Sequence, residues 1–171
     1  MTIYILCGPP GAGKTTIVNK SMSPGDLIID LDSLGKAITG QDLQGYIFNT
    51  PKSILDILIP LKSTLIDLAI HYHNDGYCRN VWITMGGARW LDRKRLVDRI
   101  EKSSFKLIVL EISHNTCREH IKNDITRGSW QLWDPRIKKW WNDYQPGKGD
   151  IIVSTNELEN FSIFPKEEKP G

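Results

Sequence analysis

Near its start the chain reads Gly8-Pro9-Pro10-Gly11-Ala12-Gly13-Lys14-Thr15-Thr16. This stretch fits the pattern G-x-x-x-x-G-K-[ST] at every fixed position. Residues 3–7, just before it, form a short apolar run that predicts a buried strand, and residues 14–22 predict a helix. A strand, a glycine-rich turn and a helix in this order are the structural context that the pattern requires.

The chemistry of this pattern is phosphate binding. Its glycines allow consecutive backbone N–H groups to point into one anion-binding nest, and the helix that follows presents its positive N-terminus. Lys14 is expected to reach the β- and γ-phosphates, the Thr15 hydroxyl to be a ligand of Mg²⁺, and Thr16 to contact the α-phosphate. We therefore predict a P-loop that binds ATP, or another nucleoside triphosphate, with Mg²⁺. Its predicted nucleotide-binding residues are Gly8, Pro10, Gly11, Ala12, Gly13, Lys14, Thr15 and Thr16.

Short apolar runs and helical patterns alternate along the rest of the chain. Further strands are predicted at 27–29, 80–85, 106–112 and 151–153, and further helices at 33–38, 53–73, 91–100, 115–125 and 135–144. The alternation predicts one α/β P-loop NTPase domain, residues 1–164, whose five-stranded, mostly parallel sheet carries helices on both faces. Pro60 is expected at a kink or between two helices. Residues 165–171 are charged and Pro-rich, which predicts a disordered tail.

Composition argues against several classes of protein. The 171 residues carry a formal net charge of +2, so bulk charge does not indicate nucleic-acid binding. The most apolar long segment, 53–70, contains Asp56, Lys62 and Asp67, which argues against a membrane span. Three widely spaced cysteines without a C-x-x-C pair argue against a disulfide framework and against zinc, and favour a reducing compartment. We expect a cytoplasmic protein with neither membrane nor zinc as a partner.

Two carboxylates follow the second predicted strand. Asp30 and Asp32 lie at its carboxyl end, and ligands of parallel sheets bind beyond such ends. Either one is a candidate general base that would take the proton of an attacking hydroxyl. The alternative is structural, because Asp32 or Ser33 would also serve to start the next helix. Both interpretations stay open for Asp30, and the functional one is favoured for Asp32.

Three segments together resemble a known family. They are residues 8–16, the sequence Ile29-Asp30-Leu31-Asp32, and Cys117-Arg118 leading to Arg127-Gly128. They look like the small P-loop kinases related to bacteriophage polynucleotide 5′-kinase, to zeta-type toxins and to phage AAA-domain ATP-binding proteins. In this order they extend over roughly residues 2–155.

The resemblance implies roles for individual residues. Asp32 takes the place of the general base, Arg127 that of a lid arginine on the transferring phosphate, and Arg118 that of an arginine flanking the adenine. Lys14, Asp32 and Arg127 are then the catalytic residues. The chain departs from polynucleotide kinase at Gly35, where that kinase has a basic residue, and at 84–87, where it has an acid. These departures leave the acceptor and part of the Mg²⁺ shell open.

We therefore predict an ATP-dependent kinase that transfers the γ-phosphoryl group to a hydroxyl acceptor, expected to be a small nucleoside, nucleotide or sugar. One alternative is a polynucleotide 5′-hydroxyl kinase acting on a nucleic-acid acceptor. Another is a nucleotide-gated ATPase that is no kinase and signals to a partner. The role of Asp32 discriminates, since a kinase needs a base there and a switch does not.

The segment after Arg127 is rich in tryptophan. Residues 127–134 are expected to form a loop in which Trp130 is a candidate for base stacking. Trp133, Ile137, Trp140 and Tyr144 recur at helical spacing, which predicts a buried stripe. Residues 89–102 form a basic segment, which is expected to be the solvated face of a helix.

Overall fold

One parallel sheet forms the centre of the molecule. The structure is a computed structural model and describes residues 2–40, 51–100 and 102–163. The strands pair in the order β2-β3-β1-β4-β5, and every neighbouring pair is parallel. Their bounds are β1 Ile3–Cys7, β2 Leu27–Ile29, β3 Val81–Met85, β4 Phe105–Glu111 and β5 Ile151–Ser154. The α/β architecture with a five-stranded sheet is confirmed.

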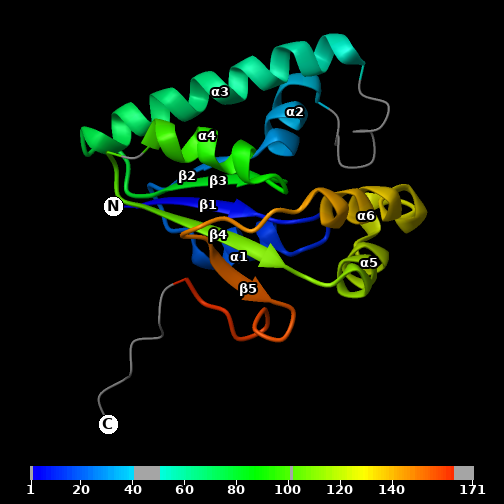
Figure 1. Cartoon of the computed structure of the whole chain (residues 1–171). Coiled ribbons are helices and arrows are strands. Elements are labelled where there is room, and N and C mark those ends of the chain that lie inside the picture. The colour runs from blue at the N-terminus through cyan, green and yellow to red at the C-terminus, as the bar shows by residue number, and fades with distance from the viewer. Residues whose placement is uncertain (1, 41–50, 101, 164–171) are drawn as a thin grey trace.

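Helices cover both faces of this sheet. They are α1 (Lys14–Ser21), α2 (Leu31–Thr39), α3 (Lys52–Asn74), α4 (Trp90–Ile100), α5 (His114–Asn123) and α6 (Asp134–Asp143). Helices α3 and α4 lie over one face, while α1 and α5 contribute to the core on the other (Figure 1). Helices α2 and α6 stand at the end of the sheet where β1 finishes. That end is where the P-loop follows β1.

The central strand explains why its sequence is an uninterrupted apolar run. Ile3 and Ile5 point to the core beneath α3 and α4, whereas Tyr4 and Leu6 point to the core beneath α1 and α5. A strand buried on both faces has no solvated side on which polar residues would alternate. Tyr4 also stacks on Trp82 of β3, with ring centroids 4.3 Å apart.

Several local expectations need correction. Pro60 lies inside one continuous helix, α3, so of the two positions expected for it only the one between two helices is wrong. The carbonyl that loses its partner belongs to exposed Asp56, where water can replace the missing N–H. Residues 125–132 are not an open loop but contain two short 3₁₀ helices, η2 (Ile125–Arg127) and η3 (Trp130–Leu132). The predicted tail 165–171 lies outside the described residues.

Among the described charged residues of the basic helix, Arg93 is buried, whereas the others reach solvent. The Arg93 side chain is fully buried and donates to the Asp150 carboxylate at 2.9 Å, to the carbonyl of Ala88 at 2.9 Å, and to the carbonyls of Gly87 and Gln145. A buried charge is tolerated when it is paired and hydrogen-bonded in this way. Arg93 therefore joins the turn after β3 to the connection between α6 and β5.

Candidate active site

A cavity of about 550 Å³ lies beyond the carboxyl ends of β1, β2 and β3. This is the position at which open α/β sheets bind their ligands. All eight predicted P-loop residues line it: Gly8, Pro10, Gly11, Ala12, Gly13, Lys14, Thr15 and Thr16. Asp32 and Arg127, predicted from distant parts of the chain, line the same cavity.

The P-loop is held in shape by helix α5. Gly11 has φ +79°, and a Cβ added to it would lie 2.5 Å from the carbonyl oxygen of Cys117. The imidazole Nδ1 of His120 donates to the carbonyl of Gly11 at 2.7 Å. Gly13, which precedes α1, has φ +90°. These left-handed positions favour glycine and aim the loop's N–H groups inward, as a phosphate cradle requires.

The ammonium group of Lys14 contacts backbone carbonyls of the P-loop. Its Nζ donates to the carbonyls of Gly8 and Pro9, at 2.8 and 2.9 Å. Burial lowers the pKa of Lys14 to about 8, and the positive charge of Arg127 adds to this effect. The phosphates of a nucleotide would supply the missing negative charge, so the residues present fit the group that the P-loop implies.

Nucleotide binding is therefore expected to take up a proton at about pH 8. In the free protein Lys14 is partly neutral at that pH, and bound phosphate raises its pKa again, so affinity should fall as pH rises through this value. Calorimetric titration of ADP–Mg²⁺ in two buffers of different ionisation enthalpy measures the uptake. In a Lys14→Arg variant, whose guanidinium stays charged, the uptake should disappear. Equal binding heats in both buffers for the parent protein would contradict the expected proton uptake.

Of the two carboxylates that follow β2, Asp30 and Asp32, the first has a structural role. It is the N-cap of α2 and accepts from the backbone N–H of Ser33 at 2.9 Å. The hydroxyls of Ser33 and Thr84 also donate to it, Thr84 from the end of β3 at 2.5 Å. Burial alone would raise the pKa of Asp30, but these hydrogen bonds outweigh it and the net direction is downward.

Asp32 lies in the first turn of α2 and has the opposite character. Among the described residues, none donates a hydrogen bond to its carboxylate. Burial raises its pKa, and the charge of Asp30 raises it further, while Arg127 and Lys14 counteract part of the shift. A carboxylate with open acceptor positions and a raised pKa is suited to take a proton from a bound ligand.

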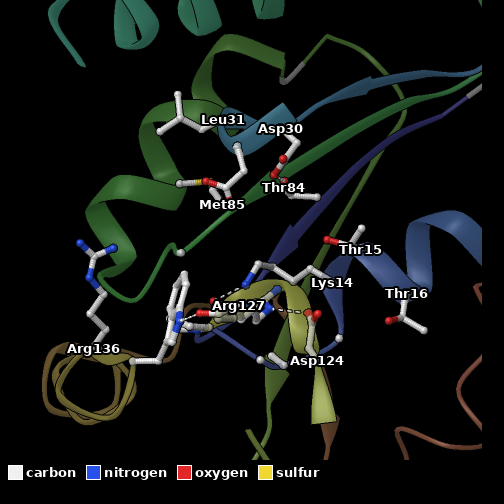
Figure 2. A pocket seen from close by; sticks show the side chains of 18 of the residues that line it. Lys14, Thr15, Thr16, Asp30, Leu31, Thr84, Met85, Asp124, Arg127 and Arg136 are labelled. Carbon is white, nitrogen blue, oxygen red and sulfur yellow. Dashed lines mark hydrogen bonds and ion pairs between the residues drawn. The ribbon is translucent and has the colours of Figure 1, made fainter. Parts of the chain in front are cut away.

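Arg127 is held towards the P-loop. Its Nε donates to Asp124 Oδ2 at 2.9 Å, and its guanidinium lies 5.2 Å from the ring centroid of Trp133. The indole of Trp133 donates to the Arg127 carbonyl at 3.0 Å. Figure 2 shows the Arg127 side chain beside Lys14, with Asp124 on its other side. The arginine is thus held on the P-loop side of the cavity.

Arg118 lies apart from this group. It is not among the residues lining the cavity; it donates to Asn115 at 3.1 Å and packs over Trp130 at 5.1 Å. Trp130 does not line the cavity either, whereas Trp133 does. Of the predicted stripe, Trp133, Ile137 and Trp140 are buried, whereas Tyr144 at the end of α6 is only half-buried.

Three cavity residues have no local sequence signal. Lys62, from the middle of α3, donates to the carbonyl of Thr84 at 2.7 Å. Thr84 is the last but one residue of β3, in the segment 84–87 where polynucleotide kinase has an acid, and Arg136 lines the cavity from α6. Lys62 and Arg136 reach the cavity from helices that are distant in sequence from the P-loop, so spacing does not show that they meet there.

A second cavity, of about 520 Å³, adjoins the P-loop. It shares Gly11, Gly13, Thr16, Asp124 and Arg127 with the first. It is also lined by the apolar side chains of Leu158 and Phe161 and by His120. The two cavities therefore meet at the P-loop.

Solved structures show the class of the fold. A candidate kinase of Chloroflexus aurantiacus covers 94% of this chain and 88% of its own at 15% identity, with a TM-score of 0.59. A gluconokinase from Sinorhizobium meliloti covers 93% and 86% at 12% identity (TM-score 0.57), and a shikimate kinase from Bacteroides thetaiotaomicron 93% and 88% at 18% identity (TM-score 0.55). The chain therefore has the fold of P-loop kinases.

Sequence comparisons assign the chain to no family. No family model matches the chain, and no curated protein matches it. In the part of the chain that the structure describes, no helix combines the length and apolar character needed to cross a membrane. Within those residues, no three His, Cys, Asp or Glu side chains gather as a metal would require.

Proposed function

We propose that this protein is a kinase that binds ATP with Mg²⁺ and transfers the γ-phosphoryl group to a hydroxyl of a small molecule. One observation supports this most. Asp32, with its raised pKa and no donor among the described residues, lines the same cavity as Lys14 and Arg127. Transfer to a hydroxyl needs a base at this place, whereas a nucleotide switch does not need one.

Each residue has a distinct task in the proposed reaction. Magnesium-bound ATP would supply the phosphoryl group and a metal that neutralises charge on it, with Thr15 as a protein ligand of the ion. Lys14 would exchange its contacts with the P-loop carbonyls for the β- and γ-phosphates. Asp32 would accept the proton of the acceptor hydroxyl as the new P–O bond forms. Arg127 would balance the charge that develops on the transferred group.

The second cavity is the proposed place of the nucleobase. Leu158 and Phe161 offer an apolar wall for a flat ring, and His120 lies at the edge next to Gly11. This arrangement gives the base-binding role to residues after β5. Arg118, which the resemblance suggested for that role, faces Asn115 and Trp130 instead.

The acceptor is proposed to be small. Two of the similar structures, at low identity, are named for kinases of gluconate and of shikimate. The cavity of about 550 Å³ must also hold the phosphates of the nucleotide, so it leaves room for a compact molecule.

The test is a screen of acceptors with γ-labelled ATP. Sugars, sugar acids, nucleosides, nucleotides and a 5′-hydroxyl oligonucleotide would be compared, and transfer to one of the small molecules is expected. Lys14→Ala should weaken nucleotide binding by roughly 10–100-fold, as expected for lost charge-assisted hydrogen bonds, with little change in melting temperature. Preferred labelling of the oligonucleotide would support a polynucleotide kinase, and ATP hydrolysis without any acceptor a nucleotide-gated ATPase.

A further inference from the structure

Arg136 marks the side of the cavity on which an acceptor would bind. It lies in the first part of α6 and lines the cavity together with Leu31, Asp32 and Met85. In Figure 2 its guanidinium lies on the side of Leu31 and Met85, away from Thr16. We call these four residues the acceptor side. Asp32, the proposed base, belongs to it.

The remaining charged groups of the cavity serve one another or the nucleotide. Asp30 is saturated by Ser33 and Thr84, and Lys62 adds its positive charge beside it. Lys62 itself donates to the carbonyl of Thr84. Arg127 is paired with Asp124 next to the P-loop.

Arg136 interacts with Asp32 in a way that the reaction would change. Burial lowers the pKa of Arg136, and the negative charge of Asp32 counteracts this shift. The guanidinium nevertheless stays protonated, because its ordinary pKa is very high. In the proposed transfer the acceptor's O–H bond breaks, its proton moves to Asp32, the new O–P bond forms, and the bond from the γ-phosphorus to ADP breaks. Asp32 is neutral at the end of this step, so its charge no longer stabilises Arg136.

Building on the proposed kinase function, we propose that the acceptor carries a carboxylate or a phosphate besides its hydroxyl, and that Arg136 binds this anionic group. The planar fork of a guanidinium matches both anions with two parallel hydrogen bonds. Leu31 and Met85 offer apolar contacts to the carbon skeleton between the hydroxyl and the anion. The acceptor is thus a small acid, a sugar phosphate or a nucleotide, and not a neutral sugar or nucleoside. Arg136 determines this specificity.

Matched acceptors test the proposal. A sugar is compared with its sugar acid and its sugar phosphate, and a nucleoside with its monophosphate. The parent protein should prefer an anionic member, and the sugar acid and sugar phosphate show which anion it takes. Arg136→Gln should lower kcat/KM for that acceptor by about 10–100-fold through KM, with the KM for ATP unchanged. Lys138→Gln, which removes an exposed charge of the same helix, is the control and should behave like the parent.

A binding measurement needs no turnover. Inorganic sulfate is added to the protein saturated with a non-hydrolysable ATP analogue and Mg²⁺, so that the terminal phosphate site is filled. Sulfate should raise the melting temperature of the parent and of Lys138→Gln, and raise that of Arg136→Gln much less. Equal use of neutral and anionic acceptors, or an unchanged sulfate response in Arg136→Gln, would overturn the anion site and leave the kinase function standing. Absence of transfer to every acceptor would overturn the kinase function instead, while the sulfate response still decides whether Arg136 binds an anion.

Discussion

Replacing Asp32 by Asn is expected to slow phosphoryl transfer by roughly 10²–10⁴-fold, the usual contribution of a general base. The amide keeps the size of the side chain and cannot take up the proton. Nucleotide affinity should change little, because Lys14 and the P-loop backbone are left intact. Single-turnover transfer to an identified acceptor, together with nucleotide titration, measures both effects.

Asp30→Asn is the matched comparison for this variant. Asp30 is the N-cap of α2 and accepts from Thr84, so its replacement should lower the melting temperature, an effect that Asp32→Asn should largely lack. The parent should also lose activity as pH falls through the pKa of Asp32, and this acidic limb should lie above that of an ordinary aspartate, because burial raises the pKa. If Asp32→Asn turned over like the parent, Asp32 would not be the base.

Arg127→Met is expected to reduce kcat by about 10³-fold or more, the range attributed to an arginine that stabilises a transferring phosphoryl group. Asp124 and Trp133 already hold the guanidinium beside Lys14, so most of the loss should appear in kcat. Steady-state kinetics at saturating ATP, with KM for ATP measured in parallel, tests this expectation.

Arg127→Met should also change the pH at which nucleotide binding takes up a proton. The positive charge of Arg127 helps to lower the pKa of Lys14, so in Arg127→Met the proton uptake on nucleotide binding should shift to higher pH. Arg95→Met removes an exposed arginine of α4 and should change neither quantity. A full-rate Arg127→Met enzyme, or an unshifted uptake, would show that Arg127 faces away from the phosphates in solution.

The P-loop could be predicted because its chemistry is contiguous. Residues 8–16 contain the glycines, the lysine and the hydroxyl that one phosphate site needs, and the strand and helix on either side complete the context. The sheet could be predicted for a similar reason, since a strand buried on both faces is apolar throughout. Both signals are local and need no knowledge of packing.

The long side chains that cross between distant elements could not be predicted in the same way. Gly35 leaves no cation in the turn after Asp32, yet Lys62 reaches the neighbouring carboxylates from α3. Arg93 was expected in solvent because it lies among charged residues of an amphipathic helix, and only the packing of β5 and α6 shows that it is buried. In each case one long side chain crosses between elements that are distant in sequence.

The buried anchor at Arg93 bears on the order in which substrates bind. It ties the segment after α6 to the turn after β3, and Trp140 of α6 donates to Gly86 of that turn at 2.7 Å. Arg136 belongs to this anchored helix, whereas Arg127 belongs to a segment that also carries Ile125, whose side chain is 96% exposed. Arg136 therefore lies on a helix whose contacts with the turn after β3 do not depend on a bound nucleotide. Under the proposed kinase function, random addition of the two substrates is the expected kinetic order.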